Sequence, residues 1–260
     1  MTAAQNPLTP APVHLIGDSR NLPTPERALA IGAHPDDVDF GCGATLAKWA
    51  AAGCEVSVLV CTDGSKGTWD PTVNVDTLIA TRQSEQRAAA AALGATGDVI
   101  FLGSPDGELD SSLVERERVA YWIRMLRPTV VIGHDPWKPY RLHPDHRHAG
   151  LLACEGVVAA RDHLFFPDQH LPHHRPDLIL LFETDNADHA EDVTGFADAK
   201  VAALTAHASQ FESTMLVRES ASGDDSELAE FRAKVEAKLA AAGDAAGVTH
   251  AEVFKLIDDL

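Results

Sequence analysis

Residues 28–37 read ALAIGAHPDD, an apolar run that ends abruptly in an imidazole and two carboxylates. The apolar part is continuous and not alternating, which is typical of a strand buried on both faces of a parallel sheet. Similar runs recur along the chain, with room for a helix between each pair. The predicted strands are Ala28–Gly32, Val56–Cys61, Val99–Leu102, Val130–Ile132 and Leu178–Phe182.

Segments of helical length and composition separate these strands. The segment Ser112–Leu126 shows capping-box spacing between Ser112 and Glu115 and ends just before Pro128. The order of the elements predicts a Rossmann-like, doubly wound α/β fold with a mostly parallel sheet in a single domain. The other predicted helices are Ala44–Ala52, Thr77–Leu93, Arg147–Arg161, Phe196–Ala208 and Glu227–Ala242.

The two ends of the sequence differ in their predicted structure. Residues 1–13 show little periodicity and contain three prolines, so we expect a flexible arm there and a domain over residues 14–260. At the other end, Val253–Ile257 is predicted to add an edge strand to the sheet.

Composition narrows the class of protein. The 260 residues are 45% hydrophobic and 23% charged, as in an ordinary globular domain. A formal net charge of −18 disfavours nucleic acid and anionic membrane surfaces as partners. The sequence lacks an apolar run of spanning length and a secretory leader pattern, so we expect a cytoplasmic protein. The cysteines show no CxxC spacing, which argues against a thiolate metal site.

Polar residues follow the predicted strands directly, and in an open parallel sheet the carboxyl ends of the strands form the ligand-binding edge. A dinucleotide site would need GxGxxG directly after the first strand, whereas Gly41 and Gly43 come late and Leu46 takes the third position. The carboxylates in this place would repel a phosphate and suit a cation. The polar segments at this edge are Ala33–Asp37, Thr62–Gly64, Gly103–Gly107, Gly133–Asp135 and His143–His146.

Histidine and aspartate suit a hydrolytic Zn²⁺ site, which uses three protein ligands and leaves one position open for water. His34 and Asp37 offer two ligands, and either His143 or His146 could supply the third. Of the adjacent pair Asp36 and Asp37, one could bind the metal while the other accepts a proton from the bound water. The alternative is that these residues are ordinary turn and helix-capping groups.

The same motifs resemble the PIG-L/LmbE-like metal-dependent de-N-acetylases, and the resemblance spans most of the chain. Ala33–Asp37 followed by Gly43–Ala47 is similar to the opening motif of that family, and His143–His146 is similar to its second metal motif. Four weaker signatures are also similar: Thr62–Gly64, Arg82 with Glu85, Leu102–Gly107 and His207–Gln210.

This resemblance implies a role for each matching residue. His34, Asp37 and His146 would be the metal ligands, with Zn²⁺ as the expected cofactor and Fe²⁺ as its possible substitute. Asp36 would be the general base, and His143 would stabilise the oxyanion or protonate the departing amine. The implied protein is a metal-dependent hydrolase that removes an N-acetyl or other N-acyl group from an amino-sugar-type small molecule, with attack by a metal-bound water.

Four further residues are assigned by the same resemblance. Asp145 would orient His143, and nearby carboxylates would favour the charged form of that imidazole. Arg82 and Asp106 would contact the sugar, although a helix salt bridge from Arg82 to Glu85 is an alternative. Tyr140 is an imperfectly spaced candidate for polarising the acetyl carbonyl.

Two other functions stay open at this point. A metal-binding small-molecule module would keep the fold and the metal without turnover, and a metal-dependent phosphoesterase would need a second metal and more carboxylates. The expected partner is a small-molecule N-acylated substrate, and the sequence is compatible with a homo-oligomer. We interpret the remaining histidines of the Pro-rich connection and beyond as solvated loop residues: His163, His170, His173, His174 and His189.

Overall fold

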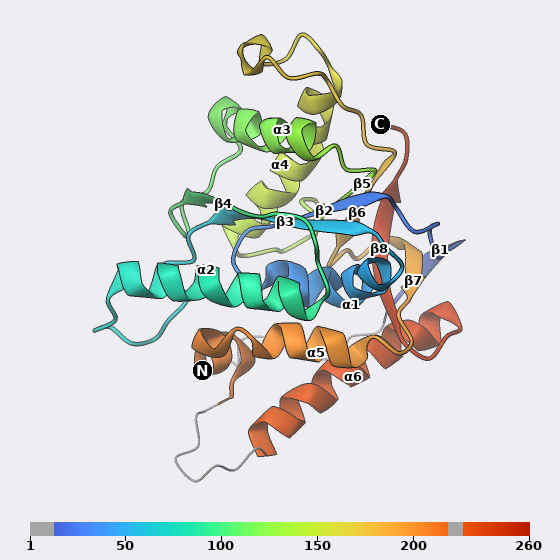
Figure 1. Cartoon of the computed structure of the whole chain (residues 1–260). Helices are drawn as coiled ribbons and strands as arrows, with labels where there is room; N and C mark the ends of the chain where they lie inside the picture. The colour runs from blue at the N-terminus through green and yellow to red at the C-terminus, as the bar shows by residue number, and fades with distance from the viewer. Residues whose placement is uncertain (1–12, 218–225) are drawn as a thin grey trace.

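The computed structural model describes residues 13–217 and 226–260. Its strands are β1 (Leu15–Arg20), β2 (Arg27–Gly32), β3 (Glu55–Thr62), β4 (Val99–Ser104), β5 (Val130–His134), β6 (Leu178–Phe182), β7 (Ala187–Asp192) and β8 (Ala251–Ile257). They form one eight-stranded sheet in the order β1-β7-β8-β6-β5-β2-β3-β4 (Figure 1). All neighbouring strands run parallel except β8, which is antiparallel to both β6 and β7.

Helices cover both faces of this sheet. They are α1 (Asp37–Ala51), α2 (Val75–Ala92), α3 (Leu113–Leu126), α4 (Pro144–Arg161), α5 (Ala197–Thr205) and α6 (Ser226–Ala246). Helices α3 and α4 lie on one face, whereas α1, α2 and α5 lie on the other, with α6 beyond α5 (Figure 1). The predicted doubly wound, mostly parallel α/β fold in a single domain is thereby confirmed.

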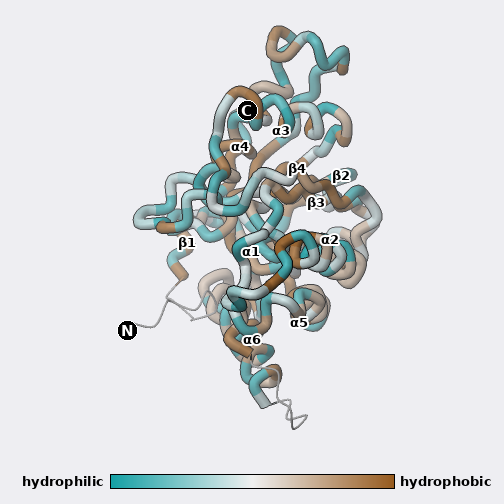
Figure 2. Tube along the Cα trace, turned by 90° about the vertical axis from the view of Figure 1, so that its left-hand side faces the viewer, coloured by the Kyte–Doolittle hydropathy of each residue, from teal (hydrophilic) through white to brown (hydrophobic). Residues whose placement is uncertain are grey.

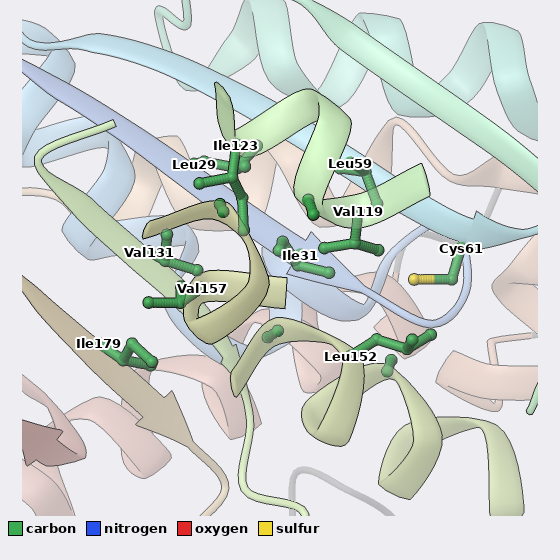
Figure 3. Packing of buried hydrophobic residues seen from close by; sticks show 14 of the residues in the cluster. Leu29, Ile31, Leu59, Cys61, Val119, Ile123, Val131, Leu152, Val157 and Ile179 are labelled. Atoms are coloured by element: carbon green, nitrogen blue, oxygen red, sulfur yellow. The ribbon is translucent and has the colours of Figure 1, made fainter. Parts of the chain in front are cut away.

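The alternation of side chains along β2 divides the core into two layers, because successive residues of a strand point to opposite faces. Leu29 and Ile31 pack under α3 and α4, where Val119, Ile123 and Leu152 close the layer (Figure 3). Ala28 and Ala30 face α1 and α2 on the other side. The central strands β2 and β3 are accordingly hydrophobic along their length (Figure 2). Because Ala28 and Ala30 are small, α1 can lie close to the sheet on this face.

Helix α1 begins at Asp37, seven residues before the predicted start at Ala44. The sequence signal was weak because Gly41 and Gly43 lower helix propensity, and Cys42 departs from helical geometry with φ −145°. Gly41 is required by packing, since a Cβ there would lie 2.5 Å from the ring of Phe182. Gly41 therefore lets α1 lie close to β6, and the helix starts directly at the first polar loop.

The prediction that Val253–Ile257 forms an edge strand is wrong, because β8 lies inside the sheet between β6 and β7. Strands β1 and β7, which were not predicted, extend the sheet beyond it. Their sequences, LIGDSR and ADHAED, are mostly polar and lack the continuous apolar character of the other strands. The predicted arm falls almost entirely on residues 1–12, which lie outside the described residues.

The interpretation of His189 as a solvated loop residue is also wrong. It lies on β7 with 0% exposure, and its Nε2 is 2.9 Å from Glu191 Oε1. Glu191 also accepts hydrogen bonds from Leu22 N and Lys48 Nζ, at 2.8 and 2.7 Å. This buried group therefore links β7 to α1. In the described part of the chain, no helix is both long and apolar enough to cross a membrane.

The topology places a crevice at the carboxyl edge of the sheet. Strands β2 and β5 are neighbours, but the helices that follow them, α1 and α4, lie on opposite faces (Figure 1). At such a switch point the two connections diverge and leave space for a ligand. The polar residues that follow β2 and β5 meet there.

Candidate metal centre

Three side chains from separate segments converge in this crevice. His34 follows β2, Asp37 opens α1, and His146 lies in the first turn of α4. His146 Nε2 is 3.2 Å from His34 Nδ1 and 3.3 Å from Asp37 Oδ1, and His34 Nδ1 is 3.3 Å from Asp37 Oδ2. The sequence prediction that these three residues come together therefore agrees with the geometry.

This spacing fits a tetrahedral metal ion. Zinc lies about 2.0–2.1 Å from nitrogen and oxygen ligands, which places neighbouring donors of a tetrahedron roughly 3.3 Å apart. His34 Nδ1 and His146 Nε2 have this separation, and each of them lies 3.3 Å from a different oxygen of Asp37. Three protein ligands at one end of an open sheet would leave the fourth position free, as a hydrolytic site requires.

The second nitrogen of His34 is oriented by carboxylates. His34 Nε2 is 3.1 Å from Asp145 Oδ2 and 3.3 Å from Asp106 Oδ1. Asp145 is itself fixed, because it accepts hydrogen bonds from Gly107 N at 2.6 Å and Leu109 N at 3.2 Å. A carboxylate on the far nitrogen is the usual support of a metal-binding histidine, because it fixes the tautomer and the direction of the ring.

The protonation states of His146 and Asp37 suit metal binding, whereas His34 would have to release a proton to bind a metal. Burial lowers the pKa of His146 to about 4, together with the charges of His134 and His34, so this imidazole is neutral near pH 7. Burial opposes ionisation of Asp37, yet His146 and His134 outweigh it and hold the pKa of Asp37 well below its usual range. Burial likewise opposes the charged form of His34, but hydrogen bonds to Asp106, Asp145 and Asp37 raise its pKa. The cluster is rich in negative charge, which a cation would neutralise.

Asp36 lies beside the three donors but in a different conformation. Its φ of 105° and ψ of −27° are rare for a residue with a Cβ and cost of order 1–3 kcal/mol. Burial raises the pKa of Asp36 to about 6, with Asp37 adding to the effect and the Arg82 guanidinium opposing it. A carboxylate with this pKa is a suitable general base near neutral pH.

Arg82 occupies a different position from the one implied by the resemblance. It is 3% exposed, and it donates to Gly64 O at 2.8 Å and to Pro35 O at 2.7 Å. Its Nη2 lies 3.5 Å from Asp36 Oδ2. The structure thus places Arg82 behind Asp36, where it holds backbone. Its alternative partner Glu85 bonds Ser209 instead.

The other two residues assigned to the substrate, Asp106 and Tyr140, lie in different surroundings. Asp106 lies within the cluster, against His34 and with Lys66 N donating to it at 3.1 Å. Tyr140 is 96% exposed, with φ 59°, on the loop between β5 and α4. Asp106 is therefore part of the site, whereas Tyr140 lies on its rim.

His143 is close to the cluster but exposed to solvent. Its ring centroid is 4.6 Å from that of His34. Burial and the charge of His34 lower the pKa of His143, and this outweighs the opposite effect of Asp145. The expectation that neighbouring carboxylates favour a charged imidazole is therefore wrong, because burial and the charge of His34 outweigh them. Asp145 bonds His34, so its effect on His143 is electrostatic.

Two residues at the site, Glu183 and Arg141, were missed from the sequence, and His134 was placed at this edge without a role. His134 Nε2 is 3.2 Å from Asp37 Oδ2, and its Nδ1 is 3.3 Å from Glu183 Oε2. Arg141 Nη1 lies 2.7 Å from Glu183 and 3.2 Å from His146 Nδ1. Glu183 follows β6, so the rule that polar residues follow strands, which pointed to His134, could have found it too. Arg141 lies in a loop and carries no such signal.

The site combines a neutral imidazole with an ionised carboxylate, and a proton acceptor directly precedes that carboxylate in the chain. This combination has the chemistry of a metal-dependent hydrolase. The comparison with protein families points the same way, because PIG-L, described as GlcNAc-PI de-N-acetylase, matches residues 29–157. The chain belongs to the PIG-L family, as the sequence motifs predicted.

The relatives agree with this family. Diacetylchitobiose deacetylase of Thermococcus kodakarensis is 34% identical over 189 residues, which is 72% of this chain and 70% of the relative. The 1D-myo-inositol 2-acetamido-2-deoxy-alpha-D-glucopyranoside deacetylase of Streptomyces scabiei is 32% identical, covering 72% of this chain and 76% of the relative. The structure of N,N'-diacetylchitobiose deacetylase from Pyrococcus horikoshii superposes with a TM-score of 0.79, at 29% identity, covering 90% and 84% of the two chains. Neither the binding module nor the phosphoesterase is favoured by these relatives.

Proposed function

We propose that this protein hydrolyses the N-acetyl group of an amino sugar, using a divalent metal held by His34, Asp37 and His146. The observation that carries the proposal is that His34 Nδ1 and His146 Nε2 lie 3.2 Å apart and each lies 3.3 Å from an oxygen of Asp37, the residue that directly follows Asp36. The named relatives act on diacetylchitobiose and on a 2-acetamido-2-deoxy-glucoside of inositol. Both substrates present an acetamide on a glucose ring, and we propose this group as the substrate class.

A divalent ion, when bound, polarises the amide carbonyl and makes a water molecule more acidic. Asp36 accepts the proton of the attacking water, because its pKa of about 6 matches neutral conditions. The C–O bond forms first, the C–N bond then breaks, and the proton taken up by Asp36 passes to the departing nitrogen, so that the products are acetate and the free amine. His143 donates a hydrogen bond to the negative charge that develops on the carbonyl oxygen.

We propose Zn²⁺ as the metal, because two imidazoles and one carboxylate are typical zinc ligands, and Fe²⁺ is the alternative. The substrate is proposed to be a small molecule in the cytoplasm. Whether the chain forms a homo-oligomer stays a prediction that oligomeric-state measurements can test.

The test is direct. Protein loaded with Zn²⁺ or Fe²⁺ is incubated with N,N'-diacetylchitobiose and with the inositol glycoside, and released acetate and free amine are measured. We expect one equivalent of each product per acetamide cleaved. Asp36→Asn, fully metallated, is the inactive control. A metallated wild-type protein that releases neither product from either compound would contradict the proposed function.

A further inference from the structure

Behind Asp36 lies a chain of three buried polar side chains that the proposed chemistry does not use. They are Asp39 of α1, Gln86 of α2 and His207, which precedes the short 3₁₀ turn η2 (Ala208–Gln210). Each of the three residues is 0% exposed. Burying polar groups from three separate elements is costly unless they are hydrogen-bonded to one another or to the backbone.

The three side chains form one hydrogen-bonded path that ends on the backbone of Asp36. Asp36 N donates to Gln86 Oε1 at 2.8 Å, and Gln86 Nε2 donates to Asp39 Oδ2 at 2.9 Å. His207 Nε2 lies 2.9 Å from the same Asp39 oxygen. A backbone N–H can only donate and a carboxylate can only accept, so the orientation of the Gln86 amide is fixed from both sides.

This path acts on the strained backbone of Asp36. The peptide plane before Asp36 is held at both ends, since Arg82 binds Pro35 O at 2.7 Å and Gln86 binds Asp36 N at 2.8 Å. The plane after it is held by Asp39 N and Phe40 N, which both donate to Asp36 O at 3.0 Å. With both flanking planes fixed, φ and ψ of Asp36 cannot relax, so the direction in which its Cα–Cβ bond leaves the backbone is fixed.

We infer that Gln86 is a positioning residue that aims the Asp36 carboxylate at the metal centre, with Asp39 and His207 fixing the Gln86 amide. The inference rests on the proposed role of Asp36 as the general base. Gln86 does not touch the reacting atoms. Loss of its hydrogen bonds should therefore reduce turnover without removing the metal ligands.

The arrangement allows a reciprocal exchange of donor and acceptor. In Gln86→Glu, two carboxylates face each other. In Asp39→Asn, by contrast, the new amide oxygen can still accept from Gln86 Nε2, because the other Asp39 oxygen, Oδ1, has no hydrogen-bond partner among the described residues and can be replaced by the NH₂ group. The double variant Asp39→Asn/Gln86→Glu restores a donor facing an acceptor on both sides. His207 can follow by changing tautomer, because its Nδ1 has no partner among the described residues.

We expect kcat on N,N'-diacetylchitobiose to fall at least about tenfold in Gln86→Glu and to stay within about threefold of wild type in Asp39→Asn, with KM within about twofold and full metal content in both. The double variant should recover to within roughly threefold of wild type. Gln86→Met, which removes both hydrogen bonds at similar volume, should match the loss expected of Gln86→Glu and replaces that variant if it fails to fold. Gln83→Glu makes the same change three residues earlier on α2, away from Asp36, and should leave kcat unchanged.

Crystal structures of the variants give a readout independent of activity. In Gln86→Met, φ of Asp36 should leave the positive region or its carboxylate should turn, while His34, Asp37 and His146 keep their places. An unmoved Asp36 with wild-type kcat would overturn the inference, as would a double variant no better than Gln86→Glu. Fully metallated Asp36→Asn that retains activity would instead contradict the proposed role of Asp36, which separates the two failures.

Discussion

At the scale of single residues, the site depends on two adjacent aspartates with different environments. The ionised Asp37 faces His134 and His146, whereas the buried Asp36 carboxylate has its pKa raised to about 6. Their positions follow from the start of α1, because Asp37 is its first residue and Asp36 precedes it with positive φ. Although the two residues are adjacent, Asp37 has the low pKa that suits a metal ligand, and Asp36 has the raised pKa that suits a general base.

Exchanging each carboxylate for an amide should separate these properties. Asp36→Asn should keep the metal and lose roughly 10²-fold or more in turnover, because an amide cannot accept the proton. Asp37→Asn should lose metal, since a neutral amide is a weaker ligand. Metal content by elemental analysis and kcat are the measurements. Equal metal content and equal rates in the two variants would contradict this division.

The two histidines of the second motif should also differ. His146→Ala removes a donor 3.2 Å from His34 Nδ1, so metal occupancy should fall and excess Zn²⁺ should partly restore activity. His143→Ala should stay metallated and lose rate, because His143 is exposed and lies beside His34. His148→Ala, whose Nδ1 lies 3.3 Å from Ser111, is the control and should change neither. A metal-depleted His143→Ala beside a metallated, active His146→Ala would reverse the assignment.

At the scale of elements, the position of His146 depends on how closely α4 approaches β5. Gly150 lies on the face of α4 that meets the end of β5, and a Cβ there would come within 2.5 Å of His134 O. A backbone atom cannot move aside as a side chain can. Gly156 lies further along the same helix, and a Cβ there would lie 2.6 Å from Val119 Cγ1 of α3.

We therefore expect Gly150→Ala and Gly156→Ala to have different effects. Both should lower the free energy of unfolding by about 1–3 kcal/mol through overpacking. Only Gly150→Ala should weaken metal affinity, because it displaces the turn of α4 that carries His146. Denaturant unfolding and metal titration of the two variants test this, and equal metal affinities would show that the approach of α4 does not set the site.

Elements that carry a local signal were predicted from the sequence, and elements that depend on distant contacts were not. The buried strands β2, β3, β5 and β6 show continuous apolar runs, and the residues that follow them supplied His34, Asp37 and His146. The polar strands β1 and β7 lack such a run. Gln86 lies within a helix, where no spacing marks its partner 50 residues away. Its role follows only from the packing of α1 against α2.

At the scale of the whole molecule, a bound metal should contribute to stability because its ligands come from distant segments. A ligand that binds only the folded state stabilises it by about 2.7 kcal/mol at a free concentration one hundred times its Kd. Adding a chelator should therefore lower the melting temperature of the wild-type protein. Asp37→Asn should be insensitive to the same treatment. A melting temperature of the wild type that a chelator leaves unchanged would argue against a bound metal.

The buried Glu191 should make stability depend on pH. Burial raises the pKa of Glu191, but hydrogen bonds from His189, Lys48 and Leu22 N outweigh it and lower the pKa below the usual value. A depressed carboxyl pKa contributes stability above the unfolded value of about 4.3, and this contribution is lost as the pH falls through the folded pKa.

Glu191→Gln should accordingly be less stable than wild type near pH 7, by roughly 1–3 kcal/mol. The difference should shrink progressively below about pH 4.3, because the wild-type carboxyl becomes protonated there. Urea unfolding of both proteins across this range is the measurement. A difference that stays constant down to pH 3 would contradict the assigned hydrogen bonds.

The placement of β8 between β6 and β7 has a consequence for synthesis on the ribosome. In the described sheet, strands β1 and β7 join the other strands through β8, yet β8 is translated well after both of them. At about 5–20 residues per second, the nascent chain waits several seconds after β7 emerges. During that interval β6 and β7 expose unpaired edges, which other nascent chains can bind. The yield of folded protein in cells should therefore depend on chaperone supply more strongly than would be expected from the stability of the folded protein.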